Sequence, residues 1–244
     1  MPRLDHYLYK NGYCRSRSLG AKLIRAGYVF VNGEECRKPS LEIGEEDRVE
    51  IRENPLDRYV SRGGLKLEEA LKEFGVSPQG LVCADIGAST GGFTDCLLQH
   101  GAAKVYAVDS GTAQLHPSLR QNSCVVSLEN TNARFLDERT VPPCPLVVMD
   151  VSFISQSLLY PAVSRILSPQ GRFISLIKPQ FEVGREYVGS GGIVRQEKAR
   201  LDCIERLKQE GEKHGLLMQK VIPSPITGGD GNEEYLALFY KEKK

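Results

Sequence analysis

The chain has 244 residues, enough for one large α/β domain or for a domain with an appendage. Its 41% hydrophobic and 26% charged residues are ordinary for a globular protein and exclude a disordered chain, a collagen and a membrane-embedded bundle. The formal net charge is only +1, and this near-neutral sum by itself gives no sign of a nucleic-acid or membrane partner.

The charge is nevertheless distributed unevenly. Residues 1–40 contain eight basic residues against three acidic ones, whereas residues 41–57 contain two basic residues against seven acidic ones. A basic lobe is therefore followed by an acidic strip, and the total conceals both.

The cysteines and histidines indicate in which cellular compartment the protein is expected and whether it is expected to bind a metal. The seven cysteines are an odd number without a C-x-x-C pair, which favours reduced thiols over disulfides or zinc ligands, and the four histidines lack metal-ligand spacing. No apolar run approaches the ~20 residues that cross a bilayer, and the first residues lack the apolar core of an export signal. We therefore expect a cytoplasmic protein with no membrane segment and no metal.

A small α+β module is predicted for residues 1–55. Its elements are a helix from Leu4 to near Asn11, a helix to Gly27 capped by Ser16 or Ser18, a strand over 28–31, a tight turn at Asn32-Gly33 and a strand over 49–51. On the second helix the three cations Arg17, Lys22 and Arg25 lie within an arc of ~140°. Leu19, Leu23 and Ala26 occupy the opposite side, so the helix is predicted to have a cationic outer face.

This module resembles the S4 RNA-binding domain. The matching motifs are Arg3-Leu4-Asp5-x-x-Leu8, Ser16-Arg17-Ser18, Leu23-Ile24, Val29-x-Val31-Asn32-Gly33 and Lys38-Pro39. The resemblance implies that cations of the module contact the phosphates of structured RNA, namely Arg3, Arg15, Arg17, Lys22, Arg25 and Lys38. A solvated helix face is the alternative for a charge cluster alone, but the full pattern favours RNA binding.

Residues 56–61 are predicted to form a linker to a larger domain over 62–244. That domain begins with a helix, because Leu67, Ala70, Leu71 and Phe74 follow helical spacing and Gly75 suits the C-terminal cap.

Short apolar runs then alternate with helical stretches. The runs cover residues 81–86, 104–109, 124–128, 145–150 and 172–177, and a last strand covers 235–240. This order predicts a doubly wound α/β fold with a parallel sheet covered on both faces. Ligands of such sheets bind at the carboxyl ends of the strands.

The first run ends in the loop Asp85-Ile86-Gly87-Ala88-Ser89-Thr90-Gly91-Gly92-Phe93. Its glycine spacing differs from that of dinucleotide-binding and phosphate-binding loops, so neither NAD nor ATP is favoured. Asp109 ends the second run, where a carboxylate can accept hydrogen bonds from both hydroxyls of a ribose.

Loop and acid together resemble the S-adenosylmethionine-binding half of class I (Rossmann-like) methyltransferases. The resemblance implies that the amino-acid part of the cofactor is held by Asp85, Gly87, Ser89, Thr90, Gly91, Gly92 and Phe93. It further implies that Asp109 holds the ribose and that the Thr131-Asn132 region, with Asn132, holds the adenine. Helix capping by residues 130–132 is the alternative for Asn132.

Four charged residues stand at element ends: Lys66, Asp150, Lys178 and Glu234. In class I methyltransferases the last strand is antiparallel, so its start lies at the same edge as the ends of its parallel neighbours, and all four side chains are expected to converge. Surface ion pairs are the alternative for any one of them. Gly184 to Val194 is predicted to be a mobile loop over this site or a spacer before the next helix.

These four residues resemble the Lys-Asp-Lys-Glu tetrad of FtsJ-like ribose 2′-O-methyltransferases. Glu233 or Glu234 fits as fourth member, and the tyrosine that follows favours Glu234. Lys178 is the candidate base for the ribose hydroxyl, because burial and the neighbouring Lys66 can lower the pKa of a lysine, while Asp150 and Glu234 orient the ammonium groups.

With the S4-like module in front, the whole chain resembles the TlyA (haemolysin A) family. The resemblance implies S-adenosylmethionine-dependent methylation of cytidine riboses during rRNA processing, with ribosomal RNA or ribosomal subunits as the partner. The alternatives are a non-catalytic RNA-binding or ribosome-assembly factor on a methyltransferase scaffold, a haemolysin, and a pseudouridine synthase. The cofactor loop and the tetrad disfavour the first and the third, and the lack of a long apolar run disfavours the second.

Overall fold

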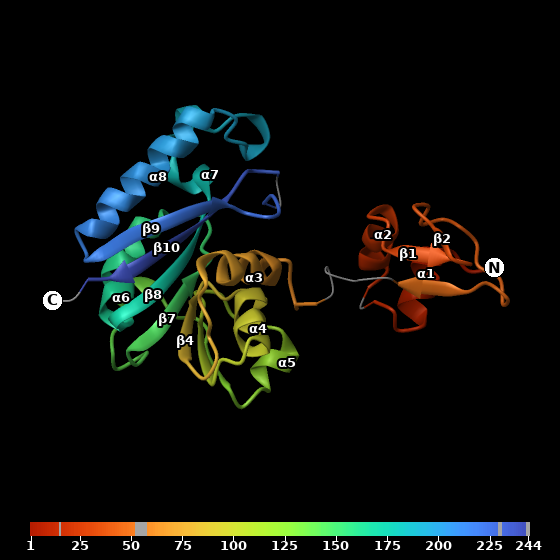
Figure 1. The fold of residues 1–244 in the computed structure, drawn as a ribbon, viewed down its shortest axis with the longest axis horizontal. Coiled ribbons are helices and arrows are strands. Elements are labelled where there is room, and N and C mark those ends of the chain that lie inside the picture. Colours follow the sequence, from red (N-terminus) through yellow and green to blue (C-terminus); the bar gives the residue numbers. More distant parts are fainter. Residues whose placement is uncertain (15, 52–57, 229–230, 243–244) are drawn as a thin grey trace. The chain divides into compact units, whose positions relative to one another are not determined.

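The computed structural model describes residues 1–14, 16–51, 58–228 and 231–242. The chain folds as two compact units, residues 1–61 and 62–244, which are described separately (Figure 1). The predicted linker over 56–61 falls partly outside the described residues, so its bounds stay a prediction.

The smaller unit packs two helices against a three-stranded antiparallel sheet. Its elements are α1 (Leu4–Lys10), α2 (Arg17–Arg25), β1 (Val29–Val31), β2 (Glu34–Glu35) and β3 (Val49–Ile51), with the strand order β2-β1-β3. Ser16 caps α2 by accepting a hydrogen bond from the backbone N–H of Leu19 at 3.2 Å. The apolar face of α2 buries Leu23 and Ile24 against Leu4 and Leu8 of α1, whereas Ala26 is exposed, contrary to the sequence-based expectation.

The predicted hairpin turn is present at Asn32-Gly33. Both residues have positive φ (55° and 86°), as the tight turns that join antiparallel strands require. The turn joins β1 to the short strand β2, which the sequence did not predict, and β3 pairs with the other edge of β1.

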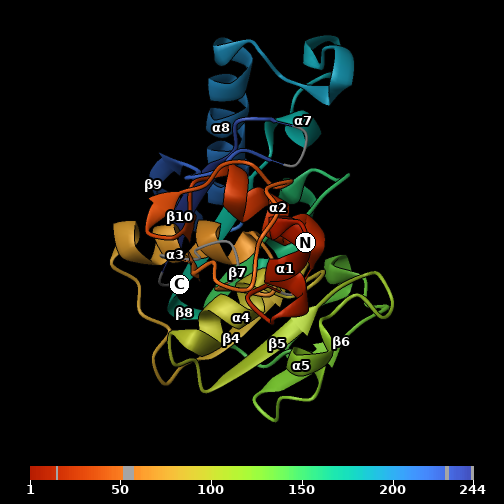
Figure 2. The same cartoon turned by 90° about the vertical axis from the view of Figure 1, so that its right-hand side faces the viewer.

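The larger unit is built around a seven-stranded sheet in the order β6-β5-β4-β7-β8-β10-β9. The strands are β4 (Val82–Ile86), β5 (Lys104–Val108), β6 (Val125–Leu128), β7 (Cys144–Met149), β8 (Leu167–Ile177), β9 (Leu216–Pro223) and β10 (Tyr235–Lys241). The first five in chain order run parallel, and β10 is antiparallel to both β8 and β9. Figure 2 shows β6 and β9 at opposite edges of this sheet.

Helices cover both faces of the sheet, which confirms the predicted doubly wound α/β fold. In Figure 1, α3 (Gly63–Phe74), α4 (Gly92–Gln99) and α5 (Pro117–Arg120) lie on one side, and α6 (Tyr160–Ile166) and α8 (Glu197–Glu212) lie on the other. A short helix, α7 (Pro179–Glu182), directly follows β8. Gly75 ends α3 in the left-handed conformation (φ 61°), as its position in the sequence predicts.

Two strands of the seven-stranded sheet differ from the sequence-based expectation. β8 begins at Leu167, directly after α6, and its extra residues pair irregularly with β7. β9 was not predicted, because this edge strand is only partly buried and includes the polar residues Gln219 and Lys220. An edge strand lacks the continuous apolar run that marks a strand buried on both faces.

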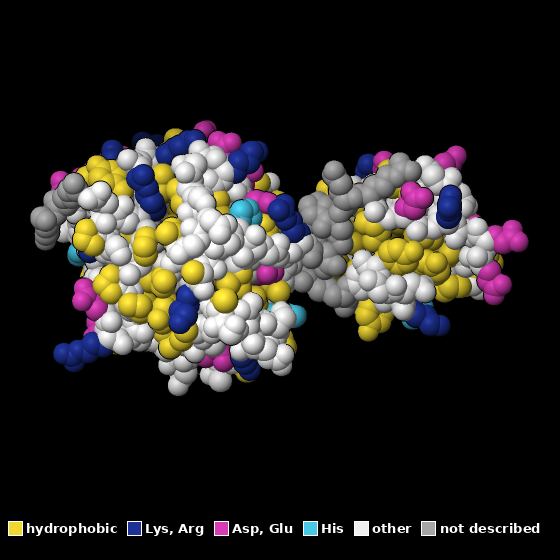
Figure 3. All heavy atoms as spheres, turned by 60° about the horizontal axis from the view of Figure 1, so that its bottom comes forward, with side chains coloured by type: hydrophobic (Ala, Val, Ile, Leu, Met, Phe, Trp, Pro, Cys, Tyr) yellow, Lys and Arg dark blue, Asp and Glu magenta, His cyan; other side chains and the backbone are white. Residues whose placement is uncertain are grey.

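The surface and the thiols agree with the composition. Figure 3 shows one face of the molecule, on which basic and acidic side chains are interspersed over the larger unit. The seven cysteines all lie in the described residues and none forms a disulfide, and burial raises the pKa of Cys83, Cys144 and Cys203 to about 12. Within the described ranges, no helix is both long and apolar enough to cross a bilayer.

Candidate active site

The site lies at the edge of the sheet where the parallel strands end and β10 begins. Tyr235, the first residue of β10, pairs with Ile177, the last residue of β8. The next residues outward, Glu234 and Lys178, are therefore neighbours at this edge. Asp150 follows the last residue of β7, the strand on the other side of β8.

Lys178 is held by two oxygen atoms from the segment after β7. Its Nζ lies 2.5 Å from Asp150 Oδ1 and donates a hydrogen bond to Ser152 Oγ at 2.8 Å. Both side chains of the ion pair are largely but not completely buried. These two contacts keep the Lys178 Nζ in one position at the edge of the sheet where the parallel strands end.

Lys66 forms the second pair, with Glu234. The Lys66 ammonium on α3 donates to Glu234 Oε2, and the two side chains are 10% and 2% exposed. Gly228 leaves room for this carboxylate, because a Cβ there would lie 2.6 Å from Glu234 Oε1. Glu233 is 62% exposed and pairs instead with Arg200 at 2.9 Å, so Glu234 is the glutamate that faces Lys66.

A cavity of about 350 Å³ adjoins the Asp150–Lys178 pair. Of the residues predicted to bind a cofactor or to act in catalysis, its lining includes Gly87, Ser89, Asp109, Asn132 and Asp150. The other predicted cofactor residues are not part of this lining, namely Asp85, Thr90, Gly91, Gly92 and Phe93. The cavity thus has walls from the ends of β4, β5, β6 and β7.

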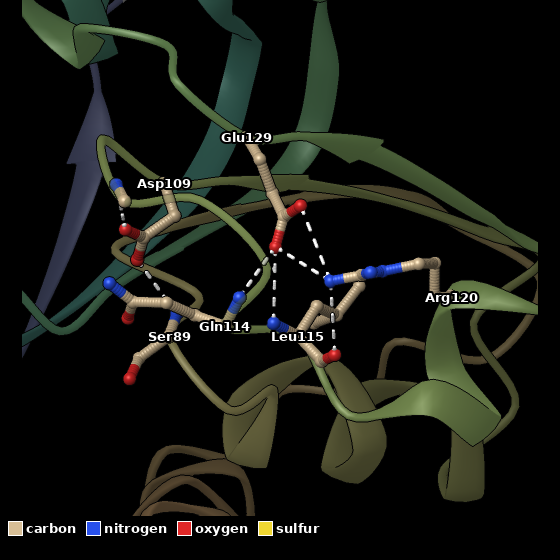
Figure 4. A network of polar contacts seen from close by, with 7 residues as sticks. Ser89, Asp109, Gln114, Leu115, Arg120 and Glu129 are labelled. Carbon is tan, nitrogen blue, oxygen red and sulfur yellow. Dashed lines mark hydrogen bonds and ion pairs between the residues drawn. The ribbon is translucent and has the colours of Figure 1, made fainter.

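Asp109 lies in this wall with its carboxylate fixed by two backbone N–H groups (Figure 4). Ser89 N–H donates to Oδ2 at 2.8 Å, and Gly111 N–H donates to Oδ1 at 2.7 Å. The first bond ties the loop after β4 to the end of β5. Each carboxylate oxygen can accept a further hydrogen bond, so Asp109 can still hold a hydroxyl group in the cavity.

Glu129, which directly follows β6, organises the neighbouring wall (Figure 4). It accepts hydrogen bonds from the backbone N–H groups of Gln114 (2.8 Å) and Leu115 (3.2 Å) and pairs with Arg120 at 3.1 Å. The Leu115 bond, the Ala113 and Gln114 bonds and the Arg120 charge lower the pKa of Glu129 despite its partial desolvation. Sequence reasoning missed this residue, although an acid at a strand end was a usable signal.

Asp85 lies beneath the loop and is fully buried. Its Oδ2 accepts a hydrogen bond from Thr94 Oγ1 at 2.6 Å, while no donor among the described residues reaches its buried Oδ1. Burial raises the pKa of Asp85 to about 7; the Asp150 and Asp109 charges add to the rise, and the Thr94 hydrogen bonds oppose it.

Two glycines let this loop pass close to its neighbours. Gly87 has φ 82°, and a Cβ there would collide with the backbone carbonyl oxygen of Asp150. Gly91 has φ 98° directly before α4, and a Cβ there would collide with the side chains of Leu119 and Leu115. Both positions therefore need glycine for backbone conformation, and Gly87 also needs it for space, because the atom in the way belongs to the backbone.

Asn132 caps a short helix and also lines the cavity. Its Oδ1 accepts a hydrogen bond from the backbone N–H of Arg134 at 3.1 Å and so caps the short 3-10 helix η2 (Ala133–Phe135). The same residue belongs to the cavity lining.

Ser152 and Phe153 are site residues that sequence reasoning missed. Phe153 lines the cavity mouth, is 90% exposed and has φ 64°, and its ring centroid lies 5.0 Å from that of Phe181. An exposed aromatic side chain with positive φ is rare and is typical of a functional position. Their place in the turn directly after Asp150 was the only sequence signal.

The segment Gly184 to Val194 is joined to the segment that carries Glu234. Asn232 is 1% exposed; its Oδ1 accepts from the backbone N–H of Val194 at 3.0 Å, and its Nδ2 donates to the Gly192 carbonyl at 2.9 Å. These bonds place the glycine-rich segment beside the start of β10. Whether it moves during turnover stays a prediction.

The cations predicted to bind RNA belong to the smaller unit. The described ones are all exposed, namely Arg3, Arg17, Lys22, Arg25 and Lys38. Arg15 lies outside the described residues. In the described parts of both units, no group of three or more His, Cys, Asp and Glu side chains is arranged to hold a metal ion.

Known protein families match each of the two units. FtsJ-like methyltransferases match residues 59–241, and S4 domains match residues 2–49. The 16S/23S rRNA (cytidine-2′-O)-methyltransferase TlyA of Mycobacterium tuberculosis is 40% identical over 96% of this chain and 87% of its own length. Hemolysin A of Brachyspira hyodysenteriae is 44% identical over 97% of this chain and 99% of its own length.

Solved structures show the same architecture. A Streptococcus thermophilus protein described as a candidate hemolysin is 41% identical and has a TM-score of 0.77, covering 100% of this chain and 89% of that one. The family matches, the relatives and the fold all agree with the two lysine–carboxylate pairs described above. This chain therefore belongs to the TlyA (hemolysin A) family, whose members join an S4 domain to an FtsJ-like methyltransferase domain.

Proposed function

We propose that the protein transfers a methyl group from S-adenosylmethionine to the ribose 2′-hydroxyl of cytidines in ribosomal RNA. The observation that carries this proposal is the placement of two lysine–carboxylate pairs, Lys178–Asp150 and Lys66–Glu234, at the sheet edge beside a cavity. The names of relatives that methylate rRNA cytidines support the choice of substrate.

The residues around the cavity fit this cofactor. The buried and unpartnered Oδ1 of Asp85 can accept a hydrogen bond from an ammonium group near the loop, and Gly87 leaves space where its backbone passes Asp150. We assign the amino-acid part to Asp85 and the loop from Gly87 to Phe93, the ribose to Asp109, and the adenine to the wall that contains Asn132.

In the proposed reaction the cofactor supplies an already activated methyl group on its sulfonium. The protein must then align a weakly acidic ribose hydroxyl with that group and remove its proton. Lys178, in its neutral form, accepts the proton at Nζ, and Asp150 and Ser152 hold that nitrogen in place. Lys66 and Glu234 complete the polar wall on the other side of β8 and orient the substrate.

The RNA is held by both units in this proposal. The exposed cations of the S4 domain contact phosphates, which fixes the position of the RNA without reading its bases. Phe153 presents an exposed ring beside Asp150, and unstacked RNA bases are commonly held on such rings.

Cofactor affinity should depend on the ionisation of Asp85. The pKa of this carboxyl is raised to about 7, so below pH 7 an incoming ammonium group must first displace a proton. The cofactor's amino group stays protonated up to a pH of ~7.7, so the product S-adenosylhomocysteine should bind about fivefold more tightly at pH 7 than at pH 6. Isothermal titration calorimetry in two buffers of different ionisation enthalpy measures both the affinity and the released proton.

The control for this pH dependence is Asp85→Asn, which should bind more weakly at pH 7 and show little change between the two pH values. Affinity in the unaltered protein that is constant, or that falls from pH 6 to pH 7, would contradict the role of Asp85.

The proposed function is tested by incubating the protein with methyl-labelled S-adenosylmethionine and with free rRNA, isolated small subunits and isolated large subunits. We expect label in RNA, on a 2′-O-methylcytidine that can be mapped by nuclease digestion and mass spectrometry. Label in protein, label on a base, or no label in any substrate would overturn the proposal.

A further inference from the structure

Asp5, in the smaller unit, is a buried carboxylate with no part in the proposed methyl transfer. It lies on α1, and its side chain is only 6% exposed. Arg3 donates to both of its oxygens, from Nε to Oδ1 and from Nη2 to Oδ2, each at 3.2 Å. Arg17, the first residue of α2, contacts the same Oδ2 through Nε at 3.2 Å.

Close packing of the two helices makes this arrangement possible. Gly20 of α2 faces α1, where a Cβ would lie 3.1 Å from the Asp5 carbonyl oxygen and 3.2 Å from Cys14 Sγ. A larger residue would push the helices apart and would draw Arg17 away from Asp5.

The carboxylate is ionised at neutral pH. Burial acts to raise the pKa of Asp5, but the hydrogen bonds and charges of Arg3 and Arg17 outweigh it and lower the pKa below the ordinary value. Because both guanidinium groups contact one oxygen, they lie side by side. They nevertheless remain 50% and 52% exposed, so their outer N–H groups can reach a ligand.

Helix stability explains the carboxylate but not the arginines. Asp5 lies in the first turn of α1, where the helix dipole favours a negative charge. Arg17 stands at the N-terminal end of α2, where the helix dipole disfavours a positive charge. Half-exposed ion pairs add little to folding stability. Two long side chains that are already ordered do, however, lose less entropy when they bind a rigid anion.

We infer that Asp5 is a positioning residue that holds Arg3 and Arg17 as one paired binding site for the phosphates of RNA. This inference rests on the proposed function, in which the S4 domain contacts rRNA. Planar guanidinium groups form directional hydrogen bonds with phosphate oxygens, so fixing their planes in advance favours this ligand over a mobile counterion.

The inference predicts an effect opposite to that of charge alone. Asp5→Asn removes a negative charge from a basic surface, so simple electrostatics predicts tighter RNA binding. If Asp5 positions the arginines, the same change should weaken binding about fivefold, because two side chains must then be ordered during association. The full-length protein and a fluorescent rRNA fragment are used in anisotropy titrations at fixed salt.

Glu46→Gln is the matched control, since it removes the same charge from an exposed position in the same unit. It should leave the affinity unchanged or slightly raise it. Arg17→Ala should weaken binding, and it should cost less in the Asp5→Asn background than in the unaltered protein. Circular dichroism checks that each variant is folded; if Asp5→Asn unfolds, Arg17→Lys, which keeps the charge but not the planar group, is expected to weaken binding in its place.

Different results would contradict the RNA-binding role of this surface and the positioning role of Asp5. If the unaltered protein does not bind rRNA, or if Arg17→Ala has no effect, the RNA-binding role of this surface fails. If Arg17→Ala weakens binding but folded Asp5→Asn binds as tightly as the unaltered protein or more tightly, the positioning role of Asp5 fails. Unchanged affinity of Arg17→Lys overturns it in the same way.

Discussion

Replacing Lys178 with alanine is expected to abolish methyl transfer while leaving RNA binding within about twofold. The variant loses the nitrogen that Asp150 and Ser152 hold at the sheet edge, and a positioned proton acceptor contributes on the order of 10²- to 10⁴-fold to a rate. Single-turnover methylation with saturating cofactor measures the chemical step, and the anisotropy titration measures RNA binding.

Two further variants make this result specific. Lys208→Ala on α8 removes a partly exposed lysine paired with Glu205 and should leave the rate unchanged. Lys178→Arg keeps the positive charge, but a guanidinium cannot give up its proton near neutral pH, so it should be nearly as inactive as alanine. An arginine variant with most of the original rate would show that Lys178 acts as a fixed cation and not as a base.

Replacing Gly87 with alanine is expected to damage both the cofactor loop and the Asp150–Lys178 pair. The new Cβ would collide with the Asp150 backbone oxygen, and the left-handed backbone itself costs about 1–2 kcal/mol for a non-glycine residue. A displacement of Asp150 by about 1 Å is enough to lower the rate by about a hundredfold. Thermal unfolding, S-adenosylhomocysteine affinity and methylation rate are measured together.

Gly80→Ala separates collision from backbone strain. Gly80 also has positive φ (73°), but nothing lies within 4 Å of the Cβ that alanine would add. This variant should be destabilised only by the backbone strain, which corresponds to a fall in Tm of about 2–8 °C, and should keep its cofactor affinity and rate. Equal losses of cofactor affinity in both variants would show that the loss in Gly87→Ala does not come from a collision with Asp150.

The features that the sequence predicted best are the strands and strand ends that follow a regular pattern of buried residues. The parallel strands are continuous apolar runs, so their ends could be placed, and with them Asp109, Asp150 and Lys178. The contact between Lys66 and Glu234 was expected from the resemblance to known enzymes, since the two residues are 168 positions apart and no local pattern links them.

Other features depend on contacts that leave no periodic pattern. β9 lies at a half-exposed edge, and the hydrogen bond that Lys178 donates to Ser152 joins two loops. The choice between Glu233 and Glu234 depended on a single step of register, which the partners Arg200 and Lys66 decide in the folded chain. The complete burial of Asp85 and its absence from the cavity lining could not be foreseen either, because the position of a carboxylate near a strand end does not determine how far the surrounding loop covers it.

The place of β10 in the sheet has a consequence for the order of events during synthesis. β10 follows the other six strands of this sheet in the sequence, yet it lies inside the sheet, between β8 and β9, and Glu234 stands immediately before it. Lys66 is made much earlier and cannot pair with Glu234 until residue 234 has been made. A chain that has emerged only as far as β9 therefore contains the loop after β4 and Lys178 but lacks the Lys66–Glu234 pair, which forms only once β10 has entered the sheet.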